Sequence, residues 1–254
     1  ELEIRKGDAI ATARGRWHPT RGDLRLDVRT RGARLSHIDA LRTAFPRLDG
    51  ALEARIDVEG SIQSLTGTAS LVASSIYAGP RALGDARFDG AVAGMSMTVR
   101  GQLSSGAIGV GGTIGIARDL PYSAALTLAN VDIPSIMAGL EGHARWKGRT
   151  SATATLNGSL VDWRHSGGEI HVAEASLEMP SLELELDAPA DFRMRRGVAS
   201  TSRPVELTGS RTRLRFHGDL GGDRLALDAS GRVDLSILET VAPGVERAGG
   251  TLLV

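Results

Sequence analysis

The sequence alternates between apolar and charged residues, one residue at a time, in several separate segments. Leu24–Arg29 places three aliphatic side chains between three charged ones, and Leu52–Glu59 repeats this over eight residues. Leu182–Asp187 is the most regular example. Because successive side chains of a β-strand point to opposite faces, each segment has one apolar and one polar side. Antiparallel sheets tolerate water on one face, whereas buried parallel strands read as continuous apolar runs. The pattern therefore predicts a one-sided antiparallel sheet.

Turn-forming sequences separate these segments about every 8 to 15 residues, as at Gly79-Pro80, Asp89-Gly90 and Asn157-Gly158. With ordinary strand and turn lengths, roughly 15 to 18 strands would fit. Three segments carry apolar residues at helical spacing with a proline in or just beyond them, and we expect short helices there: 38–45, 132–140 and 234–239.

The composition excludes several classes of protein. Thirty basic residues balance thirty acidic ones, which argues against a nucleic-acid binder that neutralises phosphates. The hydrophobic fraction of 41% is too high for a disordered chain, and no apolar run is long enough for a membrane-spanning helix. The absence of cysteine excludes disulfides and thiolate metal sites.

The basic residues are almost all arginine, since Lys6 and Lys147 are the only lysines. This excess has two readings that the sequence does not separate, a GC-rich genome or guanidinium groups that bind anionic head groups. The chain starts at Glu1 without an initiator methionine and stops at Val254 in a strand-like run. We expect it to be a piece of a longer protein.

An internal repeat underlies the pattern. Leu35, Val131 and Val233, which lead into the three expected helices, are spaced 96 and 102 residues apart. Gly-Ser turns follow the first two at comparable distances, at Gly60 and Gly158. We predict one elongated repeat array over 1–254, with approximate units 1–120, 121–220 and an incomplete 221–254.

Three segments carry a resemblance to a known family: Ala125–Ile133, Ala152–Ser159 and Asp228–Leu235. A strand, a short Val-Asp-Leu/Ile helix, a Leu-x-Gly-like strand and a Gly-Ser turn follow one another in these regions. In this order the chain resembles the TamB and AsmA-like proteins of Gram-negative envelopes, which are similar in architecture to the chorein-type bridge proteins.

The resemblance implies an all-β fold, an elongated antiparallel sheet curled into a U-shaped trough (a β-taco) with short interrupting helices. It implies phospholipid transport and outer-membrane biogenesis in the periplasm, with the parent protein anchored in the inner membrane. Phospholipids would be the ligand, and both membranes would be reached through parts of the parent outside this chain. The family's further partner is an outer-membrane barrel-assembly protein, but no segment matches the region that makes that contact.

The apolar sides of the alternating segments are the candidate lipid groove. Aromatic residues are scarce in it, which suits an open surface for flexible acyl chains better than a tightly packed core. The candidate groove residues are Leu24, Leu26, Val28, Leu52, Ala54, Ile56, Val58, Leu126, Leu128, Leu182, Leu184, Leu186, Leu214, Phe216, Leu225 and Leu227.

No catalytic or metal-binding constellation stands out, so we expect a protein that is not an enzyme and needs no cofactor. The six histidines are scattered, and His217 lies on a polar side. The glycine-rich Gly109–Gly115 is expected to be a strand rather than a dinucleotide loop, because no helix follows it. The acidic stripe of Glu183, Glu185 and Asp187 is expected to be a solvated face.

Two rival functions stay open. One is a structural or adhesive β-solenoid of the cell envelope, in which the apolar residues would be sealed in a dry core. The other, an enzyme on a β-helix, lacks a cluster of charged residues on one strand face. Exposed strand edges at the two ends of the array also predict that the isolated chain self-associates.

Overall fold

The structure is a computed structural model that describes residues 2–6, 8–18, 20, 22–39, 42, 46–61, 64–103, 106–133, 147–162, 165–179, 182–209, 211–221, 224–235 and 250–253. The chain forms two compact units. Unit 1 comprises Glu1–Leu126 with Ser159–Val161, and unit 2 comprises Thr127–Gly158 with Asp162–Val254.

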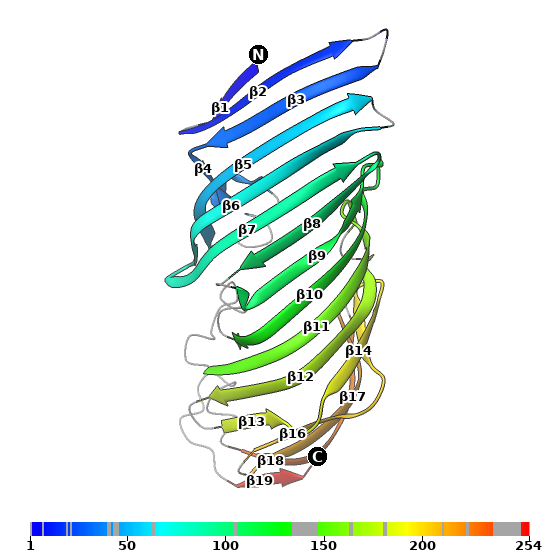
Figure 1. Cartoon of the computed structure of the whole chain (residues 1–254). Coiled ribbons are helices and arrows are strands. Elements are labelled where there is room, and N and C mark those ends of the chain that lie inside the picture. The colour runs from blue at the N-terminus through cyan, green and yellow to red at the C-terminus, as the bar shows by residue number, and fades with distance from the viewer. Residues whose placement is uncertain are drawn as a thin grey trace. The chain divides into compact units, whose positions relative to one another are not determined.

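Unit 1 is an antiparallel β-sheet whose strands follow one another in chain order (Figure 1). Its strands are β1 (Leu2–Lys6), β2 (Ala9–His18), β3 (Asp23–Arg31), β4 (Ala33–Arg34), β5 (Leu48–Ser61), β6 (Thr66–Ala78), β7 (Arg81–Ala93), β8 (Ser96–Leu103), β9 (Ile108–Gly115) and the first half of β10 (Pro121–Asp132). Each strand from β5 to β9 pairs with the next one along the chain. β4 continues β3 along β5 after Gly32, whose φ of 65° suits glycine.

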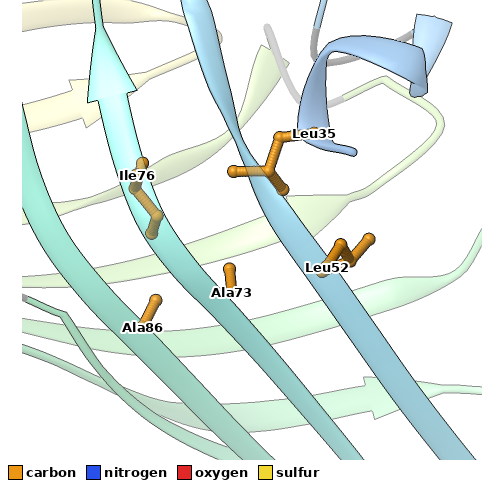
Figure 2. Packing of buried hydrophobic residues seen from close by; sticks show 5 residues of the cluster. All are labelled: Leu35, Leu52, Ala73, Ile76 and Ala86. Carbon is orange, nitrogen blue, oxygen red and sulfur yellow. The ribbon is translucent and has the colours of Figure 1, made fainter. Parts of the chain in front are cut away.

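A 3₁₀ turn, η1 (Leu35–His37), covers one end of this sheet. Its Leu35 side chain lies over β5, β6 and β7, where it meets Leu52, Ala73, Ile76 and Ala86 (Figure 2). These five residues are the buried hydrophobic cluster of the unit. Partly buried side chains surround the cluster, so close packing is concentrated at this end of the sheet, and Val92 of β7 is buried apart from it.

The carboxylate of Asp49 holds η1 in place. It accepts hydrogen bonds from Arg34 Nε at 3.1 Å, Ser36 Oγ at 2.9 Å and the Gly50 amide at 2.8 Å. The Arg34 hydrogen bond is the main reason that the pKa of Asp49 lies well below its usual range, and burial opposes it. Arg34 and Ser36 thus connect the turn that covers the apolar cluster to Asp49 of β5.

Unit 2 is also an antiparallel sheet. Its strands are the second half of β10, β11 (Lys147–Ser159), β12 (Gly167–Met179), β13 (Leu182–Leu186), β14 (Ala190–Arg195), β15 (Val198–Thr201), β16 (Val205–Thr208), β17 (Arg213–Gly221), β18 (Arg224–Asp234) and β19 (Thr251–Leu253). β11 pairs with β12, and β17 pairs with β18 over nine residue pairs.

Two prolines interrupt neighbouring strands between β12 and β17. β13 and β14 both pair with β12, one after the other, and Pro189 lies in the break between them. β16 and β15 both pair with β17 in the same way, with Pro204 in their break. Proline has no N–H to donate, so it ends a strand inside a sheet. The pairs β13–β16 and β14–β15 keep one register across both breaks.

The predicted all-β antiparallel fold is confirmed, and the expected strands at Leu24–Arg29 and Leu52–Glu59 lie in β3 and β5. Two expected turns are wrong, because Asp89-Gly90 lies inside β7 and Asn157-Gly158 inside β11. Both are paired by neighbouring strands, which overrides the local turn preference.

The curled trough and the three-part repeat stay predictions. Most of the three segments expected to be helical lies outside the described residues. In the first, the Arg42 amide donates to the Ile38 carbonyl oxygen at 2.9 Å.

Candidate functional site

One face of unit 1 is apolar from strand to strand. A row of directly opposed residues runs across eight strands: Leu2, Ala13, Val28, Ile56, Ala69, Gly90, Val99 and Gly112. Directly opposed residues of neighbouring strands lie on the same face. No polar side chain interrupts this row.

Three further rows run beside the first. The row on one side comprises Gly15, Leu26, Val58, Gly67, Val92, Met97 and Ile114. The two rows on the other side comprise Ala54, Leu71, Phe88, Gly101 and Val110, and then Leu52, Ala73, Ala86, Leu103 and Ile108. We call these four rows the apolar face of unit 1. From strand spacing and rise per residue, the first row spans about 34 Å across the strands, the third and fourth rows about 19 Å, and the four rows together about 20 Å along the strands.

The opposite face of the same strands is polar. One of its rows reads Glu3, Thr12, Arg29, Arg55, Ser70, Asp89 and Arg100. Exposed ion pairs connect its charges, including Arg29 with Asp27 at 3.1 Å and Arg87 with Asp89 at 2.9 Å. Such pairs contribute little to stability because water screens them, so this face mainly keeps the sheet solvated.

The apolar face is closely packed at one end, and most of its other side chains are half-buried or exposed. Leu52, which lies under η1, is 8% exposed, whereas Ile56, four residues further along β5 on the same side, is 37% exposed. Trp17, at the end of β2 on the same face, is 62% exposed. The last of the four rows therefore holds the closely packed cluster, and Val92 of the second row, 9% exposed, is the other buried residue among the four rows.

The surface area of the chain supports the same conclusion. The chain exposes 16683 Å² at a mass of 26.7 kDa, whereas a compact monomer of that mass exposes about 10,700 Å². Thirteen buried hydrophobic residues occur in the described part of the chain, and six of them are alanines. Both observations indicate thin sheets with little closely packed interior.

Six of the seven candidate groove residues of β3 and β5 lie in the four rows of the apolar face of unit 1, and Leu24 lies on the same side of the sheet, one row beyond them. Leu24, Leu26 and Val28 of β3 lie opposite Gly60, Val58 and Ile56 of β5. Ala54 and Leu52 follow on the same side of β5. On β10, the candidates Leu126 and Leu128 are half-buried and alternate with exposed neighbours.

Unit 2 has an apolar face of its own. Leu186 of β13 lies opposite Leu207 of β16, which lies opposite Leu214 of β17. Leu184, Phe216 and Leu227 lie on this face too, Leu184 buried and Leu227 41% exposed. The backbones of Leu182 and Leu225 pair with β12 and β17, but their side chains lie outside the described residues. The prediction thus brought together residues of two separate units.

The apolar residues of β2 and of β6 to β9 were not predicted from the sequence. The signal was present in β8, where Met97, Val99 and Leu103 alternate with Ser96, Thr98 and Arg100. Glycine also hides the pattern. The Phe88 ring lies against Gly101, where a Cβ would be only 2.1 Å from the ring. An aromatic ring of one strand thus covers the bare backbone of the next.

The polar face of unit 2 has a depression of about 640 Å³ over β11, β12, β14 and β15. A row of Thr153, His171 and Asp191 crosses it, and His171 Nδ1 lies 2.7 Å from Asp191 Oδ1. No hydrogen bond joins Thr153 to His171, and both side chains of the His–Asp pair are about half exposed. The row therefore lacks the activated hydroxyl that a hydrolytic site needs.

The other features expected from sequence are as follows. Glu183, Glu185 and Asp187 are exposed, Gly109–Gly115 lies in β9, and His217 is exposed opposite Asp228. Within the described ranges, no group of three or more histidine or acidic side chains has an arrangement that would bind a metal ion. No helix in that part of the chain is long and apolar enough to cross a bilayer.

Comparisons with known proteins give no relative. The chain matches no protein-family model, no curated protein and no solved structure.

Proposed function

We propose that this chain carries lipid without catalysis, with acyl chains lying against the apolar face of unit 1. The observation that carries the proposal is the set of four apolar rows, the first of which crosses β1 to β9, in which most side chains outside the last row are only half-buried or exposed. Uncovered apolar surface of this extent marks a binding surface in a soluble domain.

The size and chemistry of the face suit an acyl chain. A chain of about 16 carbons is about 20 Å long, and its full burial is worth roughly 12 kcal/mol at 0.8 kcal/mol per methylene. The face is longer than one such chain, and most of its residues are Leu, Ile, Val, Ala and Gly. A surface of similar aliphatic positions offers no single deep site, so a bound chain would move along it rather than be trapped.

The wider setting of the proposal is a lipid-transport protein of the TamB and AsmA-like kind. The curled trough, the periplasmic location and the inner-membrane anchor of a longer parent are parts of it. So is the delivery of phospholipid toward the outer membrane, where a barrel-assembly protein would be the partner.

Site-specific photo-crosslinking on β5 tests the proposal. A photoreactive amino acid at Ile56 should capture phospholipid when the protein is expressed in a Gram-negative host. The same probe at Arg55, one residue away on the polar face, should capture none. At Leu52, which η1 covers, capture should be several-fold lower than at position 56.

Mass spectrometry of lipid extracted from protein purified in mild detergent gives an independent readout. Phospholipid should be recovered from the wild type and lost on Ile56→Glu with Val58→Glu. A protein without lipid, with equal capture at positions 55 and 56, would overturn the proposal. The structural or adhesive role with a dry interior would then be the better reading.

A further inference from the structure

Arginine side chains gather around a depression of about 630 Å³ on the polar face of unit 2, over β16 to β19. Arg215 of β17 lies directly opposite Glu206 of β16 on one side and Ser230 of β18 on the other. Arg213, two residues before it, lies directly opposite Arg232 of β18. Among the side chains that line the depression, three positive charges against one negative charge leave a net charge of +2.

The guanidinium groups of these three arginines donate no hydrogen bond within the described residues. The carboxylate of Glu206 lies 3.8 Å from a nitrogen of Arg213 and 3.7 Å from one of Arg215, which is beyond hydrogen-bond distance. Arg232 has no acidic partner in that part of the chain. By contrast, Arg193 on β14 donates to a carboxylate at 3.1 Å. The donors around the depression are therefore available to a ligand.

The opposed arginines call for a negative charge between them. Like charges that lie directly opposite each other on neighbouring strands are destabilising, and Arg213 and Arg232 are such a pair. A phosphate group between them would supply the missing charge, because a guanidinium can donate two parallel hydrogen bonds to phosphate oxygens. A phosphate monoester carries a charge of about −1.5 to −2 at neutral pH, which matches the excess charge of the depression better than the single charge of a carboxylate does.

We propose that the depression bounded by Arg213, Arg215 and Arg232 binds the phosphate group of a phosphate monoester. The hydroxyl of Ser230 adds a neutral donor, and the carboxylate of Glu206 limits the affinity by repelling the anion. The site lies on the polar face of unit 2, so the inference does not depend on acyl chains binding to unit 1. A soluble phosphate monoester and the head group of phosphatidic acid share this chemistry, and the experiment distinguishes the two sources.

Titration with inorganic phosphate at constant ionic strength, followed by the amide chemical shifts of isotope-labelled protein, tests the site. Arg213→Gln and Arg232→Gln should each raise the Kd for phosphate about tenfold, because each removes charge-assisted hydrogen bonds. Glu206→Gln should lower the Kd about threefold, because it removes the negative charge beside the anion. Arg149→Gln removes an exposed arginine of β11 outside the depression, so it is the matched control and should leave the Kd unchanged.

Two further measurements define the ligand. Acetate at the same ionic strength should bind about tenfold more weakly than phosphate. Sedimentation with phosphatidylcholine vesicles that contain phosphatidic acid identifies the source: binding that is lost in Arg213→Gln and Arg232→Gln supports the lipid head group, and phosphate binding without vesicle binding supports a soluble monoester.

Circular dichroism should show the same strand content in all variants, and Glu206→Gln remains a test of the site if an arginine variant does not fold. The proposal would be overturned if acetate and phosphate bound equally, or if the Kd for phosphate stayed the same in the folded arginine variants. A Kd that does not fall in Glu206→Gln would overturn it as well.

Discussion

Truncation of two leucine-sized side chains on the same strand provides a quantitative test of how far the apolar face is closed. Leu52→Ala and Ile56→Ala each remove three carbon atoms from the same face of β5. If η1 seals only the end of the face, the two substitutions should differ in cost, because Leu52 is 8% exposed and Ile56 is 37% exposed.

The expected free energies of unfolding follow from burial. Three buried methylene-sized groups are worth about 2.4 kcal/mol, and a cavity beside Ala73 and Leu35 adds to this, so Leu52→Ala should cost about 3 kcal/mol. At Ile56 about six-tenths of that transfer energy applies, and water fills the space, so the cost should be about 1.5 kcal/mol. The expected difference is about 1.5 kcal/mol.

Urea unfolding followed by Trp17 fluorescence measures this difference within unit 1. Substitution of the other two tryptophans, Trp146→Phe and Trp163→Phe, leaves Trp17 as the sole reporter. Similar m-values in the two variants would allow the midpoints to be compared directly. Equal costs for Leu52→Ala and Ile56→Ala would mean that Ile56 lies in a closed core, and the reasoning for an open face would be refuted.

Three further predictions concern single positions. The pKa of Asp49 is lower in the folded protein than in the unfolded chain, where it is about 4. The Asp49 carboxylate therefore stabilises the fold above about pH 4, and this stabilisation is lost as the pH falls below that value. Acidification should lower the unfolding midpoint of the wild type more than that of Asp49→Asn. Gly101→Ala should destabilise by about 1 to 3 kcal/mol because its Cβ collides with the Phe88 ring, and a double-mutant cycle with Phe88→Leu should show much of that cost relieved. Gly218→Ala should lower the free energy of unfolding by more than about 2 kcal/mol in chemical denaturation, because φ is 143° and the new Cβ would lie 2.0 Å from a carbonyl oxygen of the neighbouring strand. Gly90→Ala is the control and should be tolerated, because its Cβ would meet nothing closer than 3.4 Å.

The strands with strong contrast between their two sides were predictable from sequence, and the others were not. In β3 and β5 leucine or valine alternates with arginine or aspartate, so face and register follow directly. In β6 to β9 the apolar side includes Gly67, Ala69 and Gly90, and the other side of the same strands includes threonine and serine. Hydrophobic periodicity is weak there, although the pairing is as regular as in β5.

Coverage of the apolar face was not predictable either. Leu52 and Ile56 have the same place in the alternating pattern, yet one is packed and the other is partly open. The difference arises from Leu35, which η1 places over β5 to β7, and from the Asp49 interactions that hold η1. Contacts between a turn and strands that follow it in the chain are a tertiary property, which local pattern does not encode.

The rows of opposed residues constrain how such a chain can change length during evolution. Removal of one residue inside a strand such as β5 would exchange the two sides of the strand beyond that point, moving Arg55 and Glu53 onto the oily surface. Removal of two residues would keep every side chain on its own side and shorten the strand by one step. Gains and losses should therefore occur in even numbers within strands, and in any number at the hairpin tips, while whole hairpins can be added without disturbing the rest.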